Sequence, residues 1–224
     1  MDVIEAIKTR KSIRGFRPSP IDRSVLRTIL EISTRAPSIL NTQPWEFAVI
    51  TGKALENIKR ENVEMFLAGK ATPAEHLVSA WPKDSVYRRR QVEIGMQLFS
   101  LMNIARDDTE KRAQWAQRGL RYFDAPAVII LLLDRKLTES GALFDMGAMA
   151  QTLCLAAVSF GLGTCIEVQG VSYPTVIRKY AHVPESKRII AAIAIGYPDK
   201  DFPANKLASA RESIDNITTW CGFE

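Results

Sequence analysis

Residues 10–14, Arg-Lys-Ser-Ile-Arg, gather basic and hydroxyl side chains near the amino end of the chain. Two guanidinium groups and a hydroxyl at this spacing form a compact set of hydrogen-bond donors for a phosphate monoester. Basic residues at the carboxyl end of a helix are also ordinary partners of the helix dipole. From these residues alone, a phosphate site and a simple helix end both remain open.

Residues 36–45, Ala-Pro-Ser-Ile-Leu-Asn-Thr-Gln-Pro-Trp, join two prolines, short polar side chains and one large aromatic. Pro37 and Pro44 fix φ and push the preceding residue away from helix, so this backbone is extended and partly rigid. Asn41 and Gln43 carry amides that can hydrogen bond with the edge of a heteroaromatic ring. The alternative is a plain loop that ends a helix and leads into a strand.

The chain lacks the usual patterns of covalent and metal catalysis. No serine lies in a GxSxG turn, and the three cysteines and two histidines show neither a nucleophile pattern nor zinc spacing. The glycines of 161–163 do not open a dinucleotide fingerprint, because Ile166 takes the third glycine position and the segment runs from helix into strand. We therefore expect no metal, and a bound cofactor that supplies the reactivity.

Composition predicts a single globular domain over residues 1–224, because 46% of the residues are hydrophobic. No apolar run reaches the roughly 18 residues that suggest a membrane span, and the start lacks a signal-peptide pattern, so we expect a cytoplasmic protein without a membrane partner. The net charge of +5 is spread along the chain. The basic clusters lack interleaved aromatics, which favours an anionic small molecule over nucleic acid.

Periodicity and turn residues predict an α+β fold, with a mixed sheet flanked by helices. Helices are expected at 3–9, from Asp22 until Pro37, at 54–66, 87–103, 109–118, 143–160 and 173–180, and strands at 46–50, 127–133, 164–168 and 189–196. Helix 143–160 is apolar around nearly its whole circumference, which predicts a fully buried central helix. Residues 53–124 are expected to form a helical insertion over the core, and residues 199–224 an extended tail.

Four separated motifs occur in a fixed order along the chain. They are R-x-S-x-R at 10–14, P-S-x-x-N-x-Q-P-W at 37–45, D-x-G-x-x-x-Q-x-L at 145–153 followed by the Gly-Leu-Gly turn, and P-A-N with R-E at 203–205 and 211–212. In these motifs, and over nearly its whole length, the chain resembles the FMN-dependent nitroreductase family. Three positions depart from the pattern: Ala208 replaces a second arginine of some relatives, Ser213 replaces a common proline, and Val168 replaces a frequent glycine. The phosphate site is therefore expected to depend on Arg10 and Arg211.

The resemblance implies an intertwined homodimer with one FMN per subunit at the interface. NADH or NADPH would deliver hydride to flavin N5, and a small nitroaromatic acceptor would then take it in a ping-pong cycle. In the family, motif 10–14 binds the FMN phosphate and ribityl chain, loop 37–45 reaches the flavin of the neighbouring subunit, and residues 166–168 pass beside N5. The implied cofactor-binding residues are Arg10, Lys11, Ser12, Arg14, Pro37, Ser38, Ile39, Asn41, Gln43, Gln151, Ile166, Glu167, Val168 and Arg211.

Four residues of the motifs and of strand 164–168 have two possible roles each. Glu167 is the candidate catalytic residue, but an acid in a strand facing a cleft can be merely solvated. Asp145 suits either helix capping or the site. Gln151 projects from a helix predicted to be buried, where an unpaired amide would cost roughly 1–3 kcal/mol, so a partner is expected. Cys165 fits a packed thiol better than a redox group, because no resolving cysteine is near.

The segment with Trp81, residues 87–90 and residues 121–126 resembles a subgroup that reduces substituted nitroaromatics, including nitrobenzoates. We hypothesise that it forms a substrate lid in which Phe123 stacks on the aromatic ring and Arg121 receives a carboxylate. The arginines can equally be solvated helix charges. Rival functions are reduction of quinones or enoates, dehalogenation or flavin breakdown on the same fold, and non-enzymic flavin binding.

Overall fold

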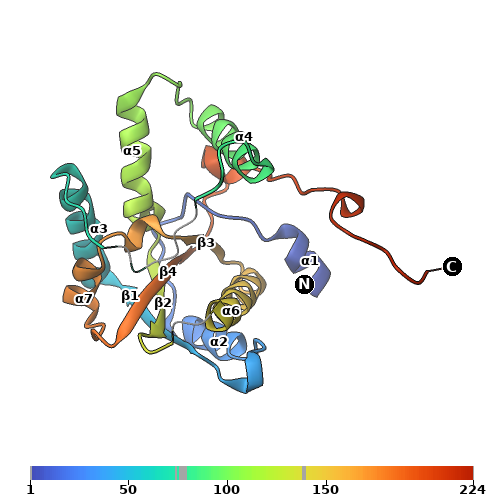
Figure 1. Cartoon of the computed structure of the whole chain (residues 1–224). Helices are drawn as coiled ribbons and strands as arrows, with labels where there is room; N and C mark the ends of the chain where they lie inside the picture. The colour runs from blue at the N-terminus through green and yellow to red at the C-terminus, as the bar shows by residue number, and fades with distance from the viewer. Residues whose placement is uncertain (1, 74, 76–79, 138–139, 224) are drawn as a thin grey trace.

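The computed structural model describes residues 2–73, 75, 80–137 and 140–223, and it shows one sheet covered by helices on both faces (Figure 1). The strands β1 (Trp45–Thr51), β2 (Ala127–Asp134), β3 (Gly163–Glu167) and β4 (Lys187–Gly196) lie in the order β1-β2-β4-β3. All three strand pairings are antiparallel, and the parallel contribution that we expected of a mixed sheet is limited to an isolated bridge between Ser12 and Thr164. The predicted α+β class is confirmed.

Two apolar cores form because the central strands are buried on both faces. Ile129 and Leu131 of β2 point to one side, where α2 (Arg23–Ser33) and α6 (Ser140–Ser159) pack. Val128 and Ile130 point to the other, where α3 (Gly52–Leu67), α5 (Thr109–Leu120) and α7 (Pro174–Ala181) pack. This arrangement explains the continuous apolar run of β2, since alternate residues serve opposite cores.

The central helix α6 differs from its prediction, because this chain buries it on one side only. Met146, Met149 and Leu153 face the core, whereas Phe144 is 76% exposed and Gly147 and Gln151 are exposed. Hydropathy records that a helix is apolar, but it does not tell which molecule covers each face. The same apolarity gives α6 the length and mean hydropathy of a membrane span, 1.4 over 18 residues, a property that core helices share.

The predicted helical insertion is smaller than expected. Leu55 and Ile58 of α3 are fully buried in the second core, so this helix is part of the main body. In contrast, α4 (Val86–Leu101) and the outer part of α5 stand away from the sheet (Figure 1). The insertion over the core therefore consists of α4 and α5.

The two ends of the chain lie on the same side of the molecule (Figure 1). The amino-terminal α1 (Val3–Thr9) is capped by Asp2, whose Oδ1 accepts a hydrogen bond from Glu5 N at 2.9 Å, and its apolar face is exposed. At the other end, η4 (Pro203–Lys206) packs on the body, and the tail after it extends away (Figure 1). The tail carries exposed apolar side chains at Ile214, Ile217, Trp220 and Phe223.

Candidate cofactor site

The basic segment, residues 10–14, lies along the free edge of β3. Ile13 N donates to Thr164 O at 2.9 Å, and Ser12 forms the bridge with the same residue. Arg14 N donates to Asn205 Oδ1 at 2.7 Å, and Asn205 Nδ2 donates to Gly15 O, also at 2.7 Å. Buried Asn205 of the P-A-N motif therefore fixes the basic segment from the carboxyl-terminal side, a role that the sequence did not indicate.

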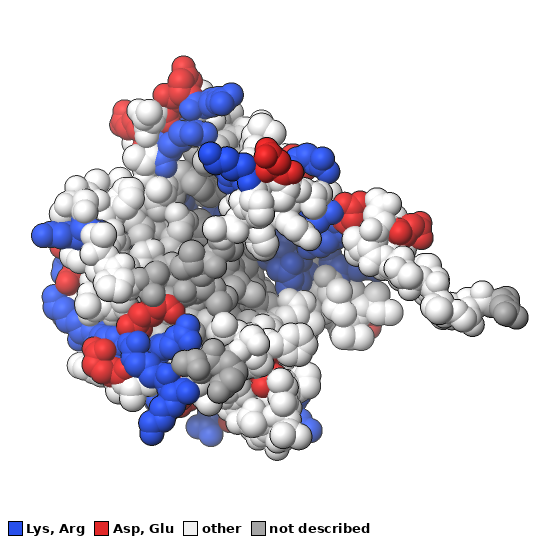
Figure 2. Space-filling view, viewed as in Figure 1, with Lys and Arg blue, Asp and Glu red and all other residues white. Residues whose placement is uncertain are grey.

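The guanidinium groups of Arg10 and Arg14 are half-buried, and neither forms an ion pair with a carboxylate in the described part of the chain. Burial raises the pKa of the Cys165 thiol to about 12 and also raises that of Cys154, while Arg14 and Arg10 respectively oppose these rises. Both thiols are thus packed and protonated at neutral pH. Partly desolvated guanidinium groups without a carboxylate favour an anionic ligand. Figure 2 shows basic side chains gathered in a hollow beside α1, between the body and the tail.

Glu167 lies at the other end of β3, about 10 Å along the strand from Thr164. Its Oε2 accepts a hydrogen bond from Gly170 N at 2.8 Å, whereas its Oε1 is buried without a partner among the described residues. Burial raises the pKa of Glu167 to about 8, which favours the neutral acid at pH 7. The alternative of a solvated acid is therefore wrong. The neighbouring Ile166 exposes 44% of its surface and offers an apolar contact beside this acid.

Two residues that the sequence analysis did not single out complete the surroundings of Glu167. Tyr122 Oη donates to Gly170 O at 2.8 Å, and Asn62 Nδ2 donates to the same oxygen at 3.0 Å. Both side chains are fully buried. Burial, and secondarily the nearby Glu167, raise the pKa of the Tyr122 hydroxyl well above its usual value, so it stays protonated and can donate.

The short helix η2 (Tyr122–Asp124) has a left-handed backbone, with φ of 55°, 54° and 60° at its three residues. Left-handed conformation costs L-residues roughly 1–2 kcal/mol each. Asp124 is held at 2.8 Å by both Arg118 and Arg121, and buried Tyr122 fixes the other end. Such strain persists only where the surrounding contacts enforce it, and it concentrates at functional sites.

Arg118 connects this left-handed turn with the basic segment. Its guanidinium packs over the Phe202 ring at 4.7 Å and donates to Arg14 O at 3.3 Å, in addition to pairing with Asp124. The Nε atom is buried without a partner among the described residues. This role of Arg118 could not be predicted from local sequence, because the residue lies in an ordinary polar helix.

Phe123 and Arg121, which we expected to contact substrate in a lid, are otherwise engaged. Phe123 is 4% exposed and packs against Trp115 with ring centroids 6.0 Å apart, so its ring belongs to the core of this chain, and its contact with substrate stays a prediction. Arg121 Nε donates to Asp124 Oδ1 at 2.8 Å. The aromatic pair that does lie exposed on the insertion is Trp81 and Tyr87, whose ring centroids are 5.4 Å apart.

Loop 36–45 is held by Asp145, whose Oδ1 and Oδ2 accept hydrogen bonds from Ile39 N at 3.2 and 3.1 Å. Asp145 lies within α6, so its alternative role as a helix cap is wrong. Leu40, Asn41 and Gln43 have φ of 50°, 59° and 47°, a second strained segment. Leu40 is 94% exposed, and Asn41 and Gln43 are exposed as well.

One chain does not bring all the predicted cofactor residues together. The loop contacts α6 at Asp145, whereas the basic segment pairs with Thr164 of β3. Gln151 lies on the exposed face of α6, which contradicts the burial that we expected for its amide. Arg211 is exposed in the tail and donates to Ser209 Oγ at 2.7 Å.

Comparisons with known proteins agree with the motifs and the fold. The model of a family described as the nitroreductase family matches residues 7–197. The chain is 32% identical to a 4-nitrobenzoate reductase of Pseudomonas putida, covering 100% of this chain and 97% of the relative, and 31% identical to a nitrobenzene nitroreductase of Ectopseudomonas oleovorans, covering 96% and 95%.

Solved structures give the same result. The FMN and NADPH-dependent nitroreductase NfnB from Sphigopyxis sp. strain HMH superposes with a TM-score of 0.94 at 29% identity, with 100% of both chains covered. The FMN-dependent nitroreductase NfnB from Mycobacterium smegmatis, solved in complex with NADPH, has a TM-score of 0.91 at 28% identity, with 99% of this chain and 100% of that one covered. On its sequence, its fold and the match over residues 7–197, the chain belongs to the nitroreductase family.

Proposed function

We propose that this protein is an FMN-dependent enzyme that uses NADH or NADPH to reduce small nitroaromatic compounds. The observation that carries the proposal is the contrast between the two ends of β3. Beside one end lie the guanidinium groups of Arg10 and Arg14, which form no ion pair in the described part of the chain. At the other end, about 10 Å away, lie the buried neutral acid Glu167 and the exposed Ile166. A cofactor with an anionic phosphate and an apolar ring matches this separation of charge and apolar surface. The names of the relatives at 31–32% identity support the choice of acceptor.

The residues present fit FMN. Arg10, Lys11, Ser12 and Arg14 would hold the phosphate and ribityl chain, and residues 166–168 would lie beside the ring. When bound, FMN would supply the two-electron redox chemistry by which hydride from NADH or NADPH reaches the acceptor together with a proton from solvent. The chain itself would bind the cofactor, orient the acceptor over it and exclude water. No covalent nucleophile is required.

We further propose that two chains share each site, because several apolar surfaces of one chain have no cover. The exposed stripe of α6, the apolar face of α1 and the apolar side chains of the tail all face solvent. Loop 36–45, whose Leu40, Asn41 and Gln43 are exposed in one chain, would then reach the partner's flavin. The positions of Gln151 and Arg211, on the exposed stripe and in the tail, suit contacts that form only in the dimer.

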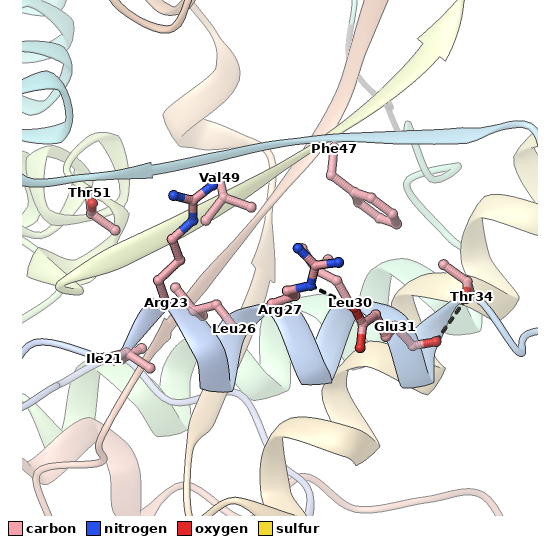
Figure 3. A pocket seen from close by; sticks show the side chains of 10 residues that line it. All are labelled: Ile21, Arg23, Leu26, Arg27, Leu30, Glu31, Thr34, Phe47, Val49 and Thr51. Carbon is pink, nitrogen blue, oxygen red and sulfur yellow. Dashed lines mark hydrogen bonds and ion pairs between the residues drawn. The ribbon is translucent and has the colours of Figure 1, made fainter.

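A groove of about 660 Å³ between α2 and the edge strand β1 suits the tail of a second subunit (Figure 3). Leu26 and Leu30 of α2 face Phe47 and Val49 of β1 across this groove. Such an apolar groove beside an open sheet edge matches an extended segment with exposed Ile217 and Trp220. This arrangement would make the dimer intertwined.

The test is purification followed by an absorption spectrum and anaerobic titration with NADH and with NADPH. We expect a yellow protein with one FMN per chain, bleaching by at least one nicotinamide, and reoxidation by 4-nitrobenzoate or nitrobenzene. A colourless protein that takes up no added FMN would refute the proposal. Bound FMN without turnover would favour a flavin carrier, and turnover only with quinones, enoates or halogenated aromatics would favour another reaction on this fold. The cytoplasmic location and the lack of membrane and nucleic-acid partners remain predictions.

A further inference from the structure

Gly170 is held through both of its backbone polar groups by side chains from three separate segments. Its carbonyl accepts from Tyr122 of η2 at 2.8 Å and from Asn62 of α3 at 3.0 Å. Its N–H donates to Glu167 Oε2 at 2.8 Å. These three side chains and Gly170, here called the Gly170 cluster, therefore fix the turn that follows β3.

The Gly170 cluster is packed too closely for any other residue at its centre. A Cβ atom built on Gly170 would lie 2.2 Å from Tyr122 Cε1 and 2.7 Å from Glu167 Oε1. Real Cβ contacts are longer, so both the ring and the carboxyl would have to move. Since interiors of this density transmit displacements, a change in one side chain shifts the turn.

Two oxygen atoms of the Gly170 cluster have no hydrogen-bond partner in the described part of the chain, Asn62 Oδ1 and Glu167 Oε1. Buried polar atoms are usually satisfied, and exceptions mark functional strain or a missing ligand. The Glu167 carboxyl contributes to the raised pKa values of Tyr122 of η2 and Cys165 of β3, and both of these groups are neutral at pH 7. Burial raises the pKa of Glu167 to about 8 and favours its protonated form, against the hydrogen bonds from the backbone N–H groups of Gly170 and Gln169.

We propose that Asn62, Tyr122 and the neutral Glu167 are positioning residues that set the backbone of 166–168 against the flavin ring and thereby tune its reduction potential. This inference rests on the proposed function. The three side chains hydrogen bond with Gly170, so they act on the neighbouring backbone through the turn. A small displacement of backbone dipoles beside the ring changes the relative affinity for oxidised and reduced flavin, because the two forms differ in hydrogen bonding and charge.

The first test replaces Tyr122 with Phe, which removes the hydroxyl that binds Gly170 and keeps the ring. We expect the variant to retain FMN with an altered visible spectrum. We also expect a roughly tenfold change in the ratio of affinities for oxidised and reduced FMN, which is about 30 mV in the two-electron potential. Tyr180→Phe is the matched control, because Tyr180 Oη donates to Glu61 of the same helix α3 at 2.7 Å and has no bond to Gly170. The proposal is overturned if the potential and spectrum of Y122F equal those of Y180F.

The second test uses Glu167→Gln, which keeps a neutral side chain of the same shape but cannot ionise. Across pH 6–9, we expect the difference in potential between this variant and the unmodified protein to change as the pH passes about 8, because only the unmodified side chain gains charge. A difference that stays constant over this range would contradict the proposed neutral acid. If the unmodified protein binds no FMN at all, the proposed function fails instead, and the two failures are thus distinguishable.

Discussion

The basic segment 10–14 and the loop 36–45 contain the most suggestive motifs of the sequence, yet the structure treats them differently. The basic segment is bound to its own chain by Thr164, Asn205 and Arg118. The loop is tied to the body by Asp145 and leaves Leu40 in solvent. One chain thus fixes the basic segment through its own contacts, whereas the loop leaves its polar side chains and Leu40 in solvent.

Removing residues 213–224 should have the largest effect, on both the oligomeric state and the bound flavin. The tail carries four exposed apolar residues, which in the proposed dimer would lie in the partner's groove, so we expect the truncated protein to be monomeric and to lose FMN. Light scattering after gel filtration measures the mass, and absorbance measures the flavin. Leu67→Ala, at an exposed apolar residue at the end of α3, should change neither and serves as the control. A truncated protein that stays dimeric and yellow would exclude the tail from the interface.

Arg10→Ala should have the next largest effect, because it removes a charged donor from the end of the site that one chain builds. Hydrogen bonds to charged groups contribute about 1.5–3 kcal/mol, so we expect FMN affinity to fall about 10- to 100-fold. Quenching of flavin fluorescence on binding provides the measurement. Arg60→Ala is the control, since Arg60 is exposed and pairs with Glu64 of the same helix α3, away from the proposed site and groove. Equal affinities of the two variants would show that Arg10 does not bind the phosphate.

Asn41→Ala should weaken FMN retention by several-fold, about 1 kcal/mol for one neutral hydrogen bond. The loss should depend on the dimer, because this loop is predicted to serve the partner's flavin. Lys53→Ala, at an exposed residue of α3, is the control for a surface change. Dissociation of FMN during gel filtration measures retention.

Mixed dimers of Arg10→Ala and Asn41→Ala chains sharpen this prediction. If each site takes Arg10 from one chain and Asn41 from the other, the mixed dimer has one intact site and one doubly altered site. We then expect half of its sites to bind FMN with the unmodified affinity. Two weakened sites, one with the loss measured for Arg10→Ala and one with the loss measured for Asn41→Ala, would place both residues in the same chain's site.

The last expected effect concerns the stability of the fold and not FMN binding, and it involves Glu167 and neither of the two motifs. Its pKa is raised from 4.5 to about 8, so the folded protein keeps a proton that the unfolded chain releases between these values. The contribution of this proton to stability is therefore full below pH 4.5 and is lost as the pH rises to about 8. As the pH rises from 4.5 to about 8, the free energy of unfolding of Glu167→Gln should increase relative to that of the unmodified protein by a few kcal/mol at most. Each kcal/mol corresponds to a shift of about 2–4 °C in the unfolding temperature. Differential scanning calorimetry from pH 5 to 9 measures the unfolding temperatures, and Glu64→Gln, at an exposed glutamate, is the control. If the unfolding temperatures of Glu167→Gln and of the unmodified protein change in parallel with pH, the buried acid is refuted.

Much of the fold follows from local pattern. The bounds of α1 agree with the prediction, and the strands agree within a few residues, because periodicity and turn residues act over short distances. The residues that complete the site are different. Asn62 meets Gly170 across 108 residues, and Arg14 meets Asn205 across 191, so neither contact leaves a trace in neighbouring sequence.

The sequence alone determined the elements, the order of the motifs and, through the resemblance that those motifs carry, the family. Only the tertiary structure decided that Glu167 is a buried acid, that Phe123 is a core residue, and that α6 is covered on one side by its own chain. The physical reason is that burial and hydrogen bonding depend on what lies opposite a side chain, whereas composition and spacing record only what lies beside it. The two motifs consequently share one prediction in sequence but contact different elements, the loop at Asp145 of α6 and the basic segment at Thr164 of β3.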